Sequence, residues 1–426
     1  MVHEKANVCS SNPKASLHLL ELSCRLSACT RLVDVARSTR RRDQPGDSST
    51  DRMVRRQKHR LENPGPGRGL SSPIALEGSI YVTTADAHSD VRSLIKFDQA
   101  DGKVLWSREV HRGPMENQHK FNTSASSTPA AEAGVIYCTF ADDKQLVVAA
   151  VSQNGEILWK VSVGSYFSKH GFAASPVVCE FGVLINGHQD GEAFVAMLAK
   201  EDGREVWRFT PPVAQRSFST PVLTQVGSDP AIILVGANRT MALKPQSGTV
   251  LWQVEGPSEK VVCSPSVGRG MVFAFGGSPD IKAFALPLDP RSAKPKRAEG
   301  NTESADPAIW RLERGMPYVP TPLLYGDYLH VIDDGGVYTC LDPATGESRR
   351  RVRKGGNTYS SPIGINGLIY SFEDSGRCVV FRNDDRYDVV AINELGESVQ
   401  ATPCVYKDSL VVRGETYLWC IRRSNE

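Results

Sequence analysis

The sequence predicts an all-β fold, an eight-bladed β-propeller whose blades are four-stranded antiparallel sheets. Eight Ser-Pro or Thr-Pro pairs recur along the chain, and successive prolines lie 40 to 57 residues apart. Between them stand short runs of apolar, β-branched and aromatic residues that end at Gly, Asn or Asp, which is the pattern of strands and turns. In four repeats a Gly is followed four positions later by a Trp. A period of about 40 to 45 residues built from short strands is typical of propeller blades.

The Ser/Thr-Pro pairs predict where each blade begins. After the second pair the sequence reads AAEAG, VIYCTFADD, KQLVVAAVSQNG and EILWKVSVG in succession, which gives one strand candidate per segment. The other intervals repeat this layout, so each is predicted to form one four-stranded blade. The eight pairs are Ser72-Pro73, Thr128-Pro129, Ser175-Pro176, Thr220-Pro221, Ser264-Pro265, Thr321-Pro322, Ser361-Pro362 and Thr402-Pro403.

The last turn and the last strand of a blade are its most regular part. The Gly supplies the positive φ that a tight hairpin needs, and the Trp follows at a fixed register. An apolar residue precedes each Trp, so we expect this strand to be buried on both faces between neighbouring blades. The Gly and Trp positions are Gly102 and Trp106, Gly155 and Trp159, Gly203 and Trp207, and Gly248 and Trp252; the preceding apolar residues are Leu105, Leu158, Val206 and Leu251. In the fifth repeat, Trp310 is expected to fill the same position.

The eighth repeat ends after three strands, so another segment must complete its blade. Propellers usually close with a strand from the opposite terminus, which removes an exposed sheet edge. We expect that strand just before Ser71, in a segment that also contains Pro64 and Pro66, which cannot donate to a ladder. The predicted organisation is therefore a disordered basic N-terminal tail over residues 1–60 and a propeller over residues 61–426.

The N-terminal tail carries the basic excess of a chain whose net charge is +2. Its RRR run at 40–42 resembles a nucleic-acid arm, but the tail has no aromatic residue to stack on bases, so we expect solvated disorder and no specific nucleic-acid partner. The segment 26–29 resembles a lipoprotein cleavage site. Glu21 and Arg25 interrupt the apolar region that such a signal needs, and we interpret the match as chance. No apolar run reaches ~18 residues, so no transmembrane segment is predicted.

The chain offers no pattern that is typical of a metal centre. The 10 cysteines are dispersed, without adjacent pairs or metal-ligand spacing, and indicate neither a disulfide framework nor a zinc site. Three Asp-Asp pairs fall in predicted hairpins, where Asp commonly shapes turns. They are Asp142-Asp143, Asp333-Asp334 and Asp384-Asp385. We predict no metal ligands and no catalytic residues.

Ligand-binding side chains are expected at the mouth of the central channel, where the innermost strand of each blade begins. The residues just before the Ser/Thr-Pro pairs are mostly basic, amide or aromatic, which suits a small anionic or planar ligand or a protein partner. Alternatively, the polar side chains are merely hydrated and the aromatic rings pack against the next blade. The candidate ligand-binding residues are His119, Lys120, Phe172, Arg216, Lys260, Tyr318 and Tyr359, and the wider set adds Arg68, Ser71, Asn122, Ser126, Lys169, His170, Phe218, Asn357 and Gln400.

Two intervals are longer than the rest because they contain extra loops. The first loop, residues 111–122, has the sequence HRGPMENQHKFN and reaches the channel mouth, so we expect it to take part in recognition. The second, residues 286–307, is rich in Lys, Arg, Pro and Ala. We expect it to be a mobile surface loop.

The segments FDQADGKVLW, SQNGEILW, AKEDGREVW and KPQSGTVLW resemble the pyrroloquinoline-quinone (PQQ) repeat, the blade unit of the quinoprotein alcohol dehydrogenase-like propellers. The resemblance covers residues 70–421 and is greatest to bacterial PQQ-binding-like repeat proteins of unassigned role. One kind of member is a dehydrogenase that holds PQQ and calcium with acidic and amide side chains and a catalytic Asp. The other kind is non-catalytic, such as the outer-membrane barrel-assembly lipoprotein. The resemblance implies a periplasmic or cell-envelope location.

The residue pattern favours the non-catalytic kind. A calcium–quinone centre needs several converging carboxylate or amide oxygens, and the candidate residues at the channel mouth include no carboxylate. We therefore expect a monomeric binding or scaffolding module that acts through a basic channel mouth and needs no cofactor. Two alternatives stay open, a PQQ-dependent alcohol or sugar dehydrogenase and a cell-envelope protein assembly factor.

Overall fold

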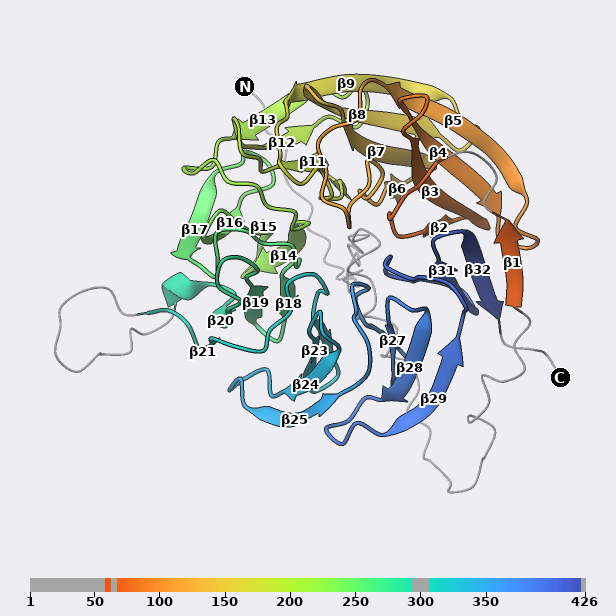
Figure 1. Cartoon of the computed structure of the whole chain (residues 1–426). Coiled ribbons are helices and arrows are strands. Elements are labelled where there is room, and N and C mark those ends of the chain that lie inside the picture. Colours follow the sequence, from red (N-terminus) through yellow and green to blue (C-terminus); the bar gives the residue numbers. More distant parts are fainter. Residues whose placement is uncertain (1–57, 63–66, 293–305, 423–426) are drawn as a thin grey trace, which may run out of the picture.

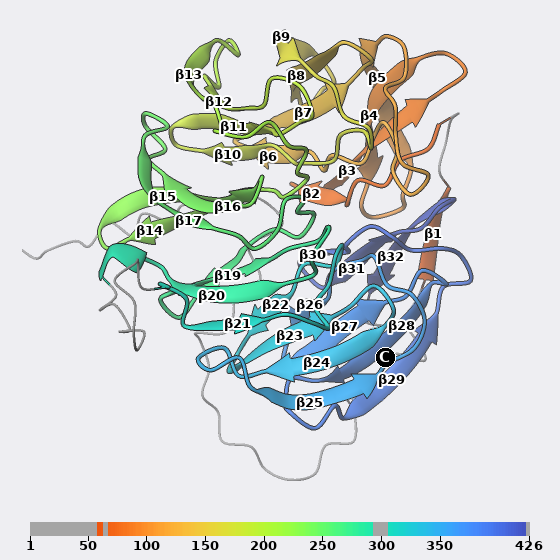
Figure 2. The same ribbon diagram turned by 60° about the vertical axis from the view of Figure 1, so that its left-hand side comes forward.

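Eight four-stranded antiparallel sheets stand around a central axis like the blades of a propeller (Figures 1 and 2). The computed structural model describes residues 58–62, 67–292 and 306–422. The predicted all-β, eight-bladed fold is confirmed. Besides strands, the described ranges contain one short 3-10 helix, Pro290–Ser292, and none of their helices is long and apolar enough to cross a membrane.

Within each blade, neighbouring strands pair in order from the axis to the rim. The innermost strands are β2 (Ile74–Leu76), β6 (Ala130–Glu132), β10 (Val177–Cys179), β14 (Val222–Val226), β18 (Ser266–Gly268), β22 (Leu323–Tyr325), β26 (Ile363–Ile365) and β30 (Cys404–Tyr406). The second strands are β3 (Ser79–Asp86), β7 (Val135–Ala141), β11 (Gly182–Gly187), β15 (Asp229–Gly236), β19 (Met271–Phe275), β23 (Tyr328–Ile332), β27 (Leu368–Phe372) and β31 (Ser409–Arg413).

The two outer positions of the blades complete the sheets. The third strands are β4 (Val91–Asp98), β8 (Gln145–Ser152), β12 (Phe194–Leu198), β16 (Arg239–Leu243), β20 (Ala283–Pro287), β24 (Val337–Leu341), β28 (Arg377–Arg382) and β32 (Tyr417–Arg422). The rim strands are β5 (Val104–Arg112), β9 (Ile157–Ser165), β13 (Glu205–Phe209), β17 (Val250–Glu255), β21 (Trp310–Leu312), β25 (Ser348–Arg353), β29 (Val389–Glu394) and β1 (Lys58–Glu62).

The hydrophobic core lies between adjacent blades rather than in one central mass. Val148 and Ala150 of β8, for example, belong to the same buried cluster as Val183 and Ile185 of β11 in the next blade. Second and third strands are therefore buried on both sheet faces, and each fully buried aliphatic side chain contributes about 1.5–3 kcal/mol. This wedge-like packing fixes the inner ends of the blades around the axis.

A belt of hydrogen bonds explains the recurrent Ser/Thr-Pro pairs. Seven of the eight Ser or Thr hydroxyls accept a hydrogen bond from the backbone N–H of the Ser or Thr in the preceding blade. The Pro that follows each Ser or Thr lies directly before the innermost strand, at a point where no donor is needed. The donor and acceptor residues are Ser72 and Thr128, Thr128 and Ser175, Ser175 and Thr220, Thr220 and Ser264, Ser264 and Thr321, Thr321 and Ser361, and Ser361 and Thr402, at 2.9–3.2 Å.

Four rim Trp side chains join their blades to the next one. Trp207 Nε1 donates to the Pro245 carbonyl at 2.7 Å, and a Cβ on Gly248 would lie 2.6 Å from the Trp207 ring. The turn glycine thus provides both a positive φ (68°) and a flat surface for the indole of the preceding blade. The same arrangement occurs at Trp106, Trp159 and, as predicted, Trp310.

The expectation that rim strands are buried on both faces is wrong. Leu105, Leu158 and Val206 are 49%, 51% and 43% exposed, whereas Trp159 and Trp207, one position later, are buried. The neighbouring blade covers the Trp face only, because the rim is the widest part of each wedge. The other face of the rim strand contacts solvent.

The eighth blade closes with a strand from the N-terminal side, as predicted. β1 pairs antiparallel with β32, from Lys58 opposite Ile421 to Glu62 opposite Tyr417. The strand begins before the segment expected from the sequence, and its first residues fall within the predicted tail. Residues 1–57, including the lipoprotein-like segment 26–29, and residues 293–305 of the second extra loop lie outside the described residues.

Two buried histidines predict that acid destabilises the fold. Burial lowers the pKa of His188 and of His330 to about 4 from an ordinary 6.5, so the folded protein resists their protonation. Because the unfolded chain binds these protons first, this stability is complete above pH 6.5 and declines as the pH falls from 6.5 towards 4. Each histidine accounts for roughly 3 kcal/mol over that window.

The free energy of unfolding, measured in urea at pH 7 and pH 5, should therefore fall with pH. A His330→Asn variant should show a weaker fall than the wild type, because it lacks one of the two titrating groups. His88, which is exposed, provides a control, and His88→Asn should keep the wild-type slope. Equal slopes for all three proteins would rule out the histidines as the cause.

Candidate functional site

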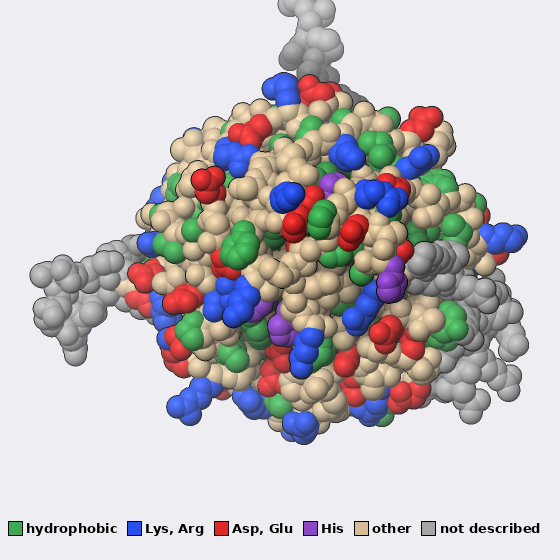
Figure 3. All heavy atoms as spheres, turned by 45° about the horizontal axis from the view of Figure 1, so that its top comes forward, with side chains coloured by type: hydrophobic (Ala, Val, Ile, Leu, Met, Phe, Trp, Pro, Cys, Tyr) green, Lys and Arg blue, Asp and Glu red, His purple; other side chains and the backbone are tan. Residues whose placement is uncertain are grey.

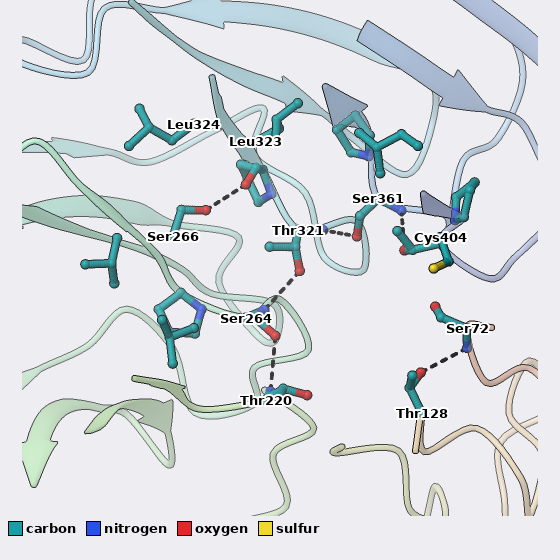
Figure 4. A pocket seen from close by; sticks show the side chains of 18 of the residues that line it. Ser72, Thr128, Thr220, Ser264, Ser266, Thr321, Leu323, Leu324, Ser361 and Cys404 are labelled. Carbon is teal, nitrogen blue, oxygen red and sulfur yellow. Dashed lines mark hydrogen bonds between the residues drawn. The ribbon is translucent and has the colours of Figure 1, made fainter. Parts of the chain in front are cut away.

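The centre of the ring contains two cavities that follow one another along the axis. One of them, of about 160 Å³, is lined by the Ser/Thr-Pro pairs and the first residues of the innermost strands. Figure 4 shows how the hydroxyls around it form the belt of hydrogen bonds between blades, for example from the Ser264 amide to Thr321. Because these hydroxyls are engaged with neighbouring blades, this part of the channel is chiefly structural.

The second cavity, of about 610 Å³, opens at the channel mouth. Its wall is built by the same position in every blade, the residue two places before each Ser or Thr of the belt. In an extended chain this position points to the same side as the hydroxyl, which places all eight side chains towards the axis. They are Leu70, Ser126, Ala173, Phe218, Val262, Val319, Tyr359 and Gln400.

Aromatic rings form much of the rest of this wall. The His119 and His170 rings are in edge contact with centroids 5.3 Å apart, and the Phe121 ring lies 5.5 Å from that of Tyr359. Phe121 precedes the second blade, whereas Tyr359 precedes the seventh. Their contact therefore crosses the mouth of the channel, and Phe121, which is 49% exposed, covers part of the opening.

The first extra loop, residues 111–122, carries His119 and Phe121 and is fixed at its base by buried charges. The Arg92 guanidinium donates to the carbonyls of Gly113 and Pro114 and pairs with the Glu116 carboxylate at 2.9 Å. The Arg92 side chain is fully buried and that of Glu116 is 5% exposed. This anchor gives the loop a defined position over the cavity.

The far end of the loop is tied to the third blade. The His119 amide and the Asn122 side-chain amide both donate to the His170 carbonyl, at 3.2 and 2.8 Å. At the near end, His111 pairs with Asp142 at 2.8 Å. The loop is thus held at three points and is an integral part of the mouth.

The electrostatics of the mouth are not those of a basic surface. Arg216 pairs with both oxygens of Asp190, at 2.7 and 2.8 Å. Burial opposes the ionisation of Asp190, but hydrogen bonds from the Lys169 amide and from Arg216 outweigh it and lower the carboxyl pKa. Burial, with the nearby Arg216 charge, lowers the pKa of His170 and favours its neutral form. On the face seen in Figure 3, acidic and basic side chains are interspersed.

One carboxylate, Asp334, lies in the cavity wall. Burial raises its pKa, although the amides of Tyr318 and Val319 donate to it at 2.6 and 3.2 Å. Those bonds hold the backbone before the sixth blade in place. Among the residues with described side chains, no group of three or more His, Cys, Asp or Glu could hold a metal ion.

The seven candidate ligand-binding residues divide into two groups. His119, Tyr318 and Tyr359 line the cavity, as do Asn122, Ser126, His170, Phe218 and Gln400 of the wider set. Lys120, Phe172, Arg216 and Lys260 do not. The cavity wall within the described ranges therefore contains no Lys or Arg, in contrast to the basic mouth that the sequence predicts.

The four candidates outside the cavity wall have contacts elsewhere. Phe172 lies in the connection between β9 and β10 and is buried against Tyr166 in a core cluster, whereas the next residue, Ala173, lines the cavity. Arg216 is engaged with Asp190, and the Lys120 ammonium lies 4.9 Å from the centroid of the Phe121 ring. The Lys260 backbone pairs with Ser278, which binds this segment to the fifth blade.

The sequence prediction missed part of the wall. Leu70, Ala173, Val262 and Val319 were not among the candidates because they are apolar or small, although their constant spacing from the belt could have found them. Three further residues are Phe121, Ile281 and Asp334. Ile281 and Asp334 lie between second and third strands, and no local signal places such residues at the axis.

Comparisons with known proteins agree with the fold. The model of the family described as outer membrane protein assembly factor BamB matches residues 57–191 and 118–352. Comparison with curated protein sequences gives no match.

Solved structures with a similar fold include natural and designed proteins. The crystal structure of BamB from Moraxella catarrhalis has a TM-score of 0.58 and 12% identity, with 85% of this chain and 100% of that chain covered. Quinohemoprotein alcohol dehydrogenase from Comamonas testosteroni has a TM-score of 0.60 and 10% sequence identity, and the match covers 86% of this chain and 75% of that chain. The computationally designed Ika8 protein has a TM-score of 0.60 and 10% sequence identity, and the match covers 86% of this chain and 100% of that chain.

At these identities the structural likeness establishes the fold alone. The family match, in contrast, extends over more than half of the chain, and the eight-bladed architecture agrees with it. The chain belongs to the PQQ-like β-propeller family whose model is described as outer membrane protein assembly factor BamB.

Proposed function

We propose that this protein is a non-catalytic binding module that takes an apolar or aromatic group of its partner into the channel-mouth cavity. The observation that carries the proposal is the cavity itself, of about 610 Å³, to which all eight blades contribute a side chain. Its volume is in the range of ligand sites, and apolar walls with a few fixed polar groups are typical of such sites.

The aromatic rings support a flat or apolar guest. His119, Phe121 and Tyr359 form a connected series of ring contacts across the mouth, and rings of this kind favour offset or edge contacts with another ring. The buried anchor of the loop 111–122 supports a preorganised site, because a fixed loop loses little entropy on binding. The description of the matching family as an assembly factor is consistent with a binding role.

A dehydrogenase that uses PQQ and calcium is less well supported by the residues at the mouth. Both oxygens of Asp334 face backbone amides. The Asn122 side-chain oxygen accepts from Thr123, and Gln400 donates to Asp374. The oxygens of Asp334 and Asn122 thus have separate local partners and the Gln400 amide is held through its nitrogen, whereas a calcium–quinone site needs several oxygens to converge. Saturable uptake of PQQ with calcium, followed by absorbance without oxygen, would favour the dehydrogenase instead.

The binding of a neutral fluorescent probe tests the proposal. N-phenyl-1-naphthylamine should bind the wild-type protein with increased fluorescence, and Tyr359→Ala should weaken binding at least fivefold because it removes one side of the ring contact. Leu158→Ala is the matched control, since Leu158 is 51% exposed on the rim, and it should bind like the wild type. Equal binding by wild type and Tyr359→Ala, or none by either, would count against the channel-mouth site.

A further inference from the structure

Three Lys or Arg side chains are buried in the described part of the chain, and one of them has no acidic partner. Arg92, Lys354 and Arg413 are 0%, 6% and 6% exposed. Arg92 pairs with Glu116 and Lys354 with Glu373, whereas no described acidic residue forms an ion pair with Arg413. Burial lowers the pKa of Arg413 to about 10. A buried charge without a counter-ion is costly, so its retention needs an explanation.

Arg413 lies at the seam between the last blade and the first. It ends β31, and its Nη1 donates to the carbonyl and the hydroxyl of Ser71, at 3.1 and 2.6 Å. Nη2 and Nε donate no hydrogen bond within the described residues. A Cβ on Gly69 would lie 2.6 Å from Nη2, so the glycine leaves room for the guanidinium.

The contact between blades does not itself require a charge. In the corresponding register of other second strands, Thr83 donates to the Ser127 carbonyl and Asn186 to the Ser219 carbonyl of the next blade. Other blades have Phe275, Ile332 and Phe372 at this position. A neutral or apolar residue is therefore enough for the contact between blades. The positive charge of Arg413 is not needed for that contact and calls for a separate explanation.

A small cavity adjoins Arg413 and shares two wall residues with the channel-mouth cavity. It has a volume of about 10 Å³, enough for about one water molecule, and its wall includes Arg68, Gly69, Arg413, Gly414 and Glu415. Leu70 and Gln400 line both this cavity and the large one. Leu70 and Gln400 therefore separate the large cavity from the unbonded edge of the guanidinium, and a group that passed between them would meet that edge.

We propose that Arg413 binds the carboxylate of a ligand whose apolar or aromatic body occupies the channel-mouth cavity. This inference rests on the proposed function and names the ligand class, an aromatic or apolar carboxylic acid. A planar carboxylate matches the edge of a guanidinium, and the small cavity has space for one carboxylate oxygen in place of a water molecule. The source is either a small molecule or the C-terminal carboxylate of a peptide.

The test compares acids with their neutral amides as competitors of bound N-phenyl-1-naphthylamine. One pair is 2-naphthoate and 2-naphthamide, and the other is Gly-Gly-Phe with a free or an amidated C-terminus. At least one acid should displace the probe tenfold more effectively than its amide, and the better pair identifies the source. Arg413→Gln should abolish the preference, whereas Lys244→Gln, which removes an exposed charge on the turn between β16 and β17, should keep it.

Each outcome distinguishes the inference from the proposed function. Equal displacement by acids and amides, or no displacement of a bound probe, would overturn the role of Arg413 and leave the channel-mouth site intact. A preference that persists in a folded Arg413→Gln variant would overturn it as well. If the variant does not fold, the acid and amide comparison in the wild type decides. If the wild type does not bind the probe at all, both proposals fail.

Discussion

Replacing Arg92 by Met is expected to destabilise the protein by about 3–5 kcal/mol, because it leaves the Glu116 carboxylate buried without its partner. The pair ties β4 to the loop 111–122, and Arg92 also donates to the carbonyls of Gly113 and Pro114. Loss of these bonds should release the loop that carries Phe121. We therefore expect a lower melting temperature and weaker binding of N-phenyl-1-naphthylamine in the same variant.

Two further variants separate this effect from a general loss of charge. Arg112 forms an exposed pair with Glu109 at the start of the same loop, and Arg112→Ala should leave both stability and probe binding nearly unchanged. The double variant Arg92→Met with Glu116→Met should recover much of the stability, because no unpaired charge remains. An Arg92→Met protein that melts and binds like the wild type would contradict the proposed anchor.

Truncation of a rim Trp should have an effect of similar size. Trp207→Ala is expected to cost about 3–5 kcal/mol, because it empties the space between the third and fourth blades and leaves the Pro245 carbonyl without its donor. The adjacent Val206 is 43% exposed, and Val206→Ala should change stability by less than about 0.5 kcal/mol. The free energies of unfolding of the two variants, measured in urea, provide the comparison. Similar losses of unfolding free energy in the two variants would mean that both faces of the rim strand are equally buried.

The repeat architecture could be predicted from the sequence because its signals are local and recur. The belt of Ser and Thr hydroxyls lies where the Ser/Thr-Pro pairs indicate, and the turn glycines precede the rim Trp residues as expected. The exposure of Leu158 could not be predicted, since an apolar pair in a strand does not reveal how wide the wedge is at the rim. The start of β1 at Lys58 was also missed, because its sequence, KHRLE, lacks a strand pattern.

The candidate site was predicted in part. The inner ends of the blades were correctly placed at the channel mouth, and Tyr318 and Tyr359 line the cavity there. The prediction favoured basic side chains, but charge alone does not show that Arg216 has a partner in Asp190, 26 positions away. Arg413 escaped notice because its burial depends on contact with Ser71, at the opposite end of the chain.

Hydrogen exchange of backbone amides with bound 2-naphthoate, or with N-phenyl-1-naphthylamine if the acid does not bind, tests the central claim most directly. If the channel mouth is the binding site, amides in the loop 117–122 and in the segments before the sixth and seventh blades, 317–319 and 357–359, should exchange more slowly in the complex. The rim strands should be unaffected. Protection confined to the rim, or a bound ligand that protects none of these segments, would contradict the account.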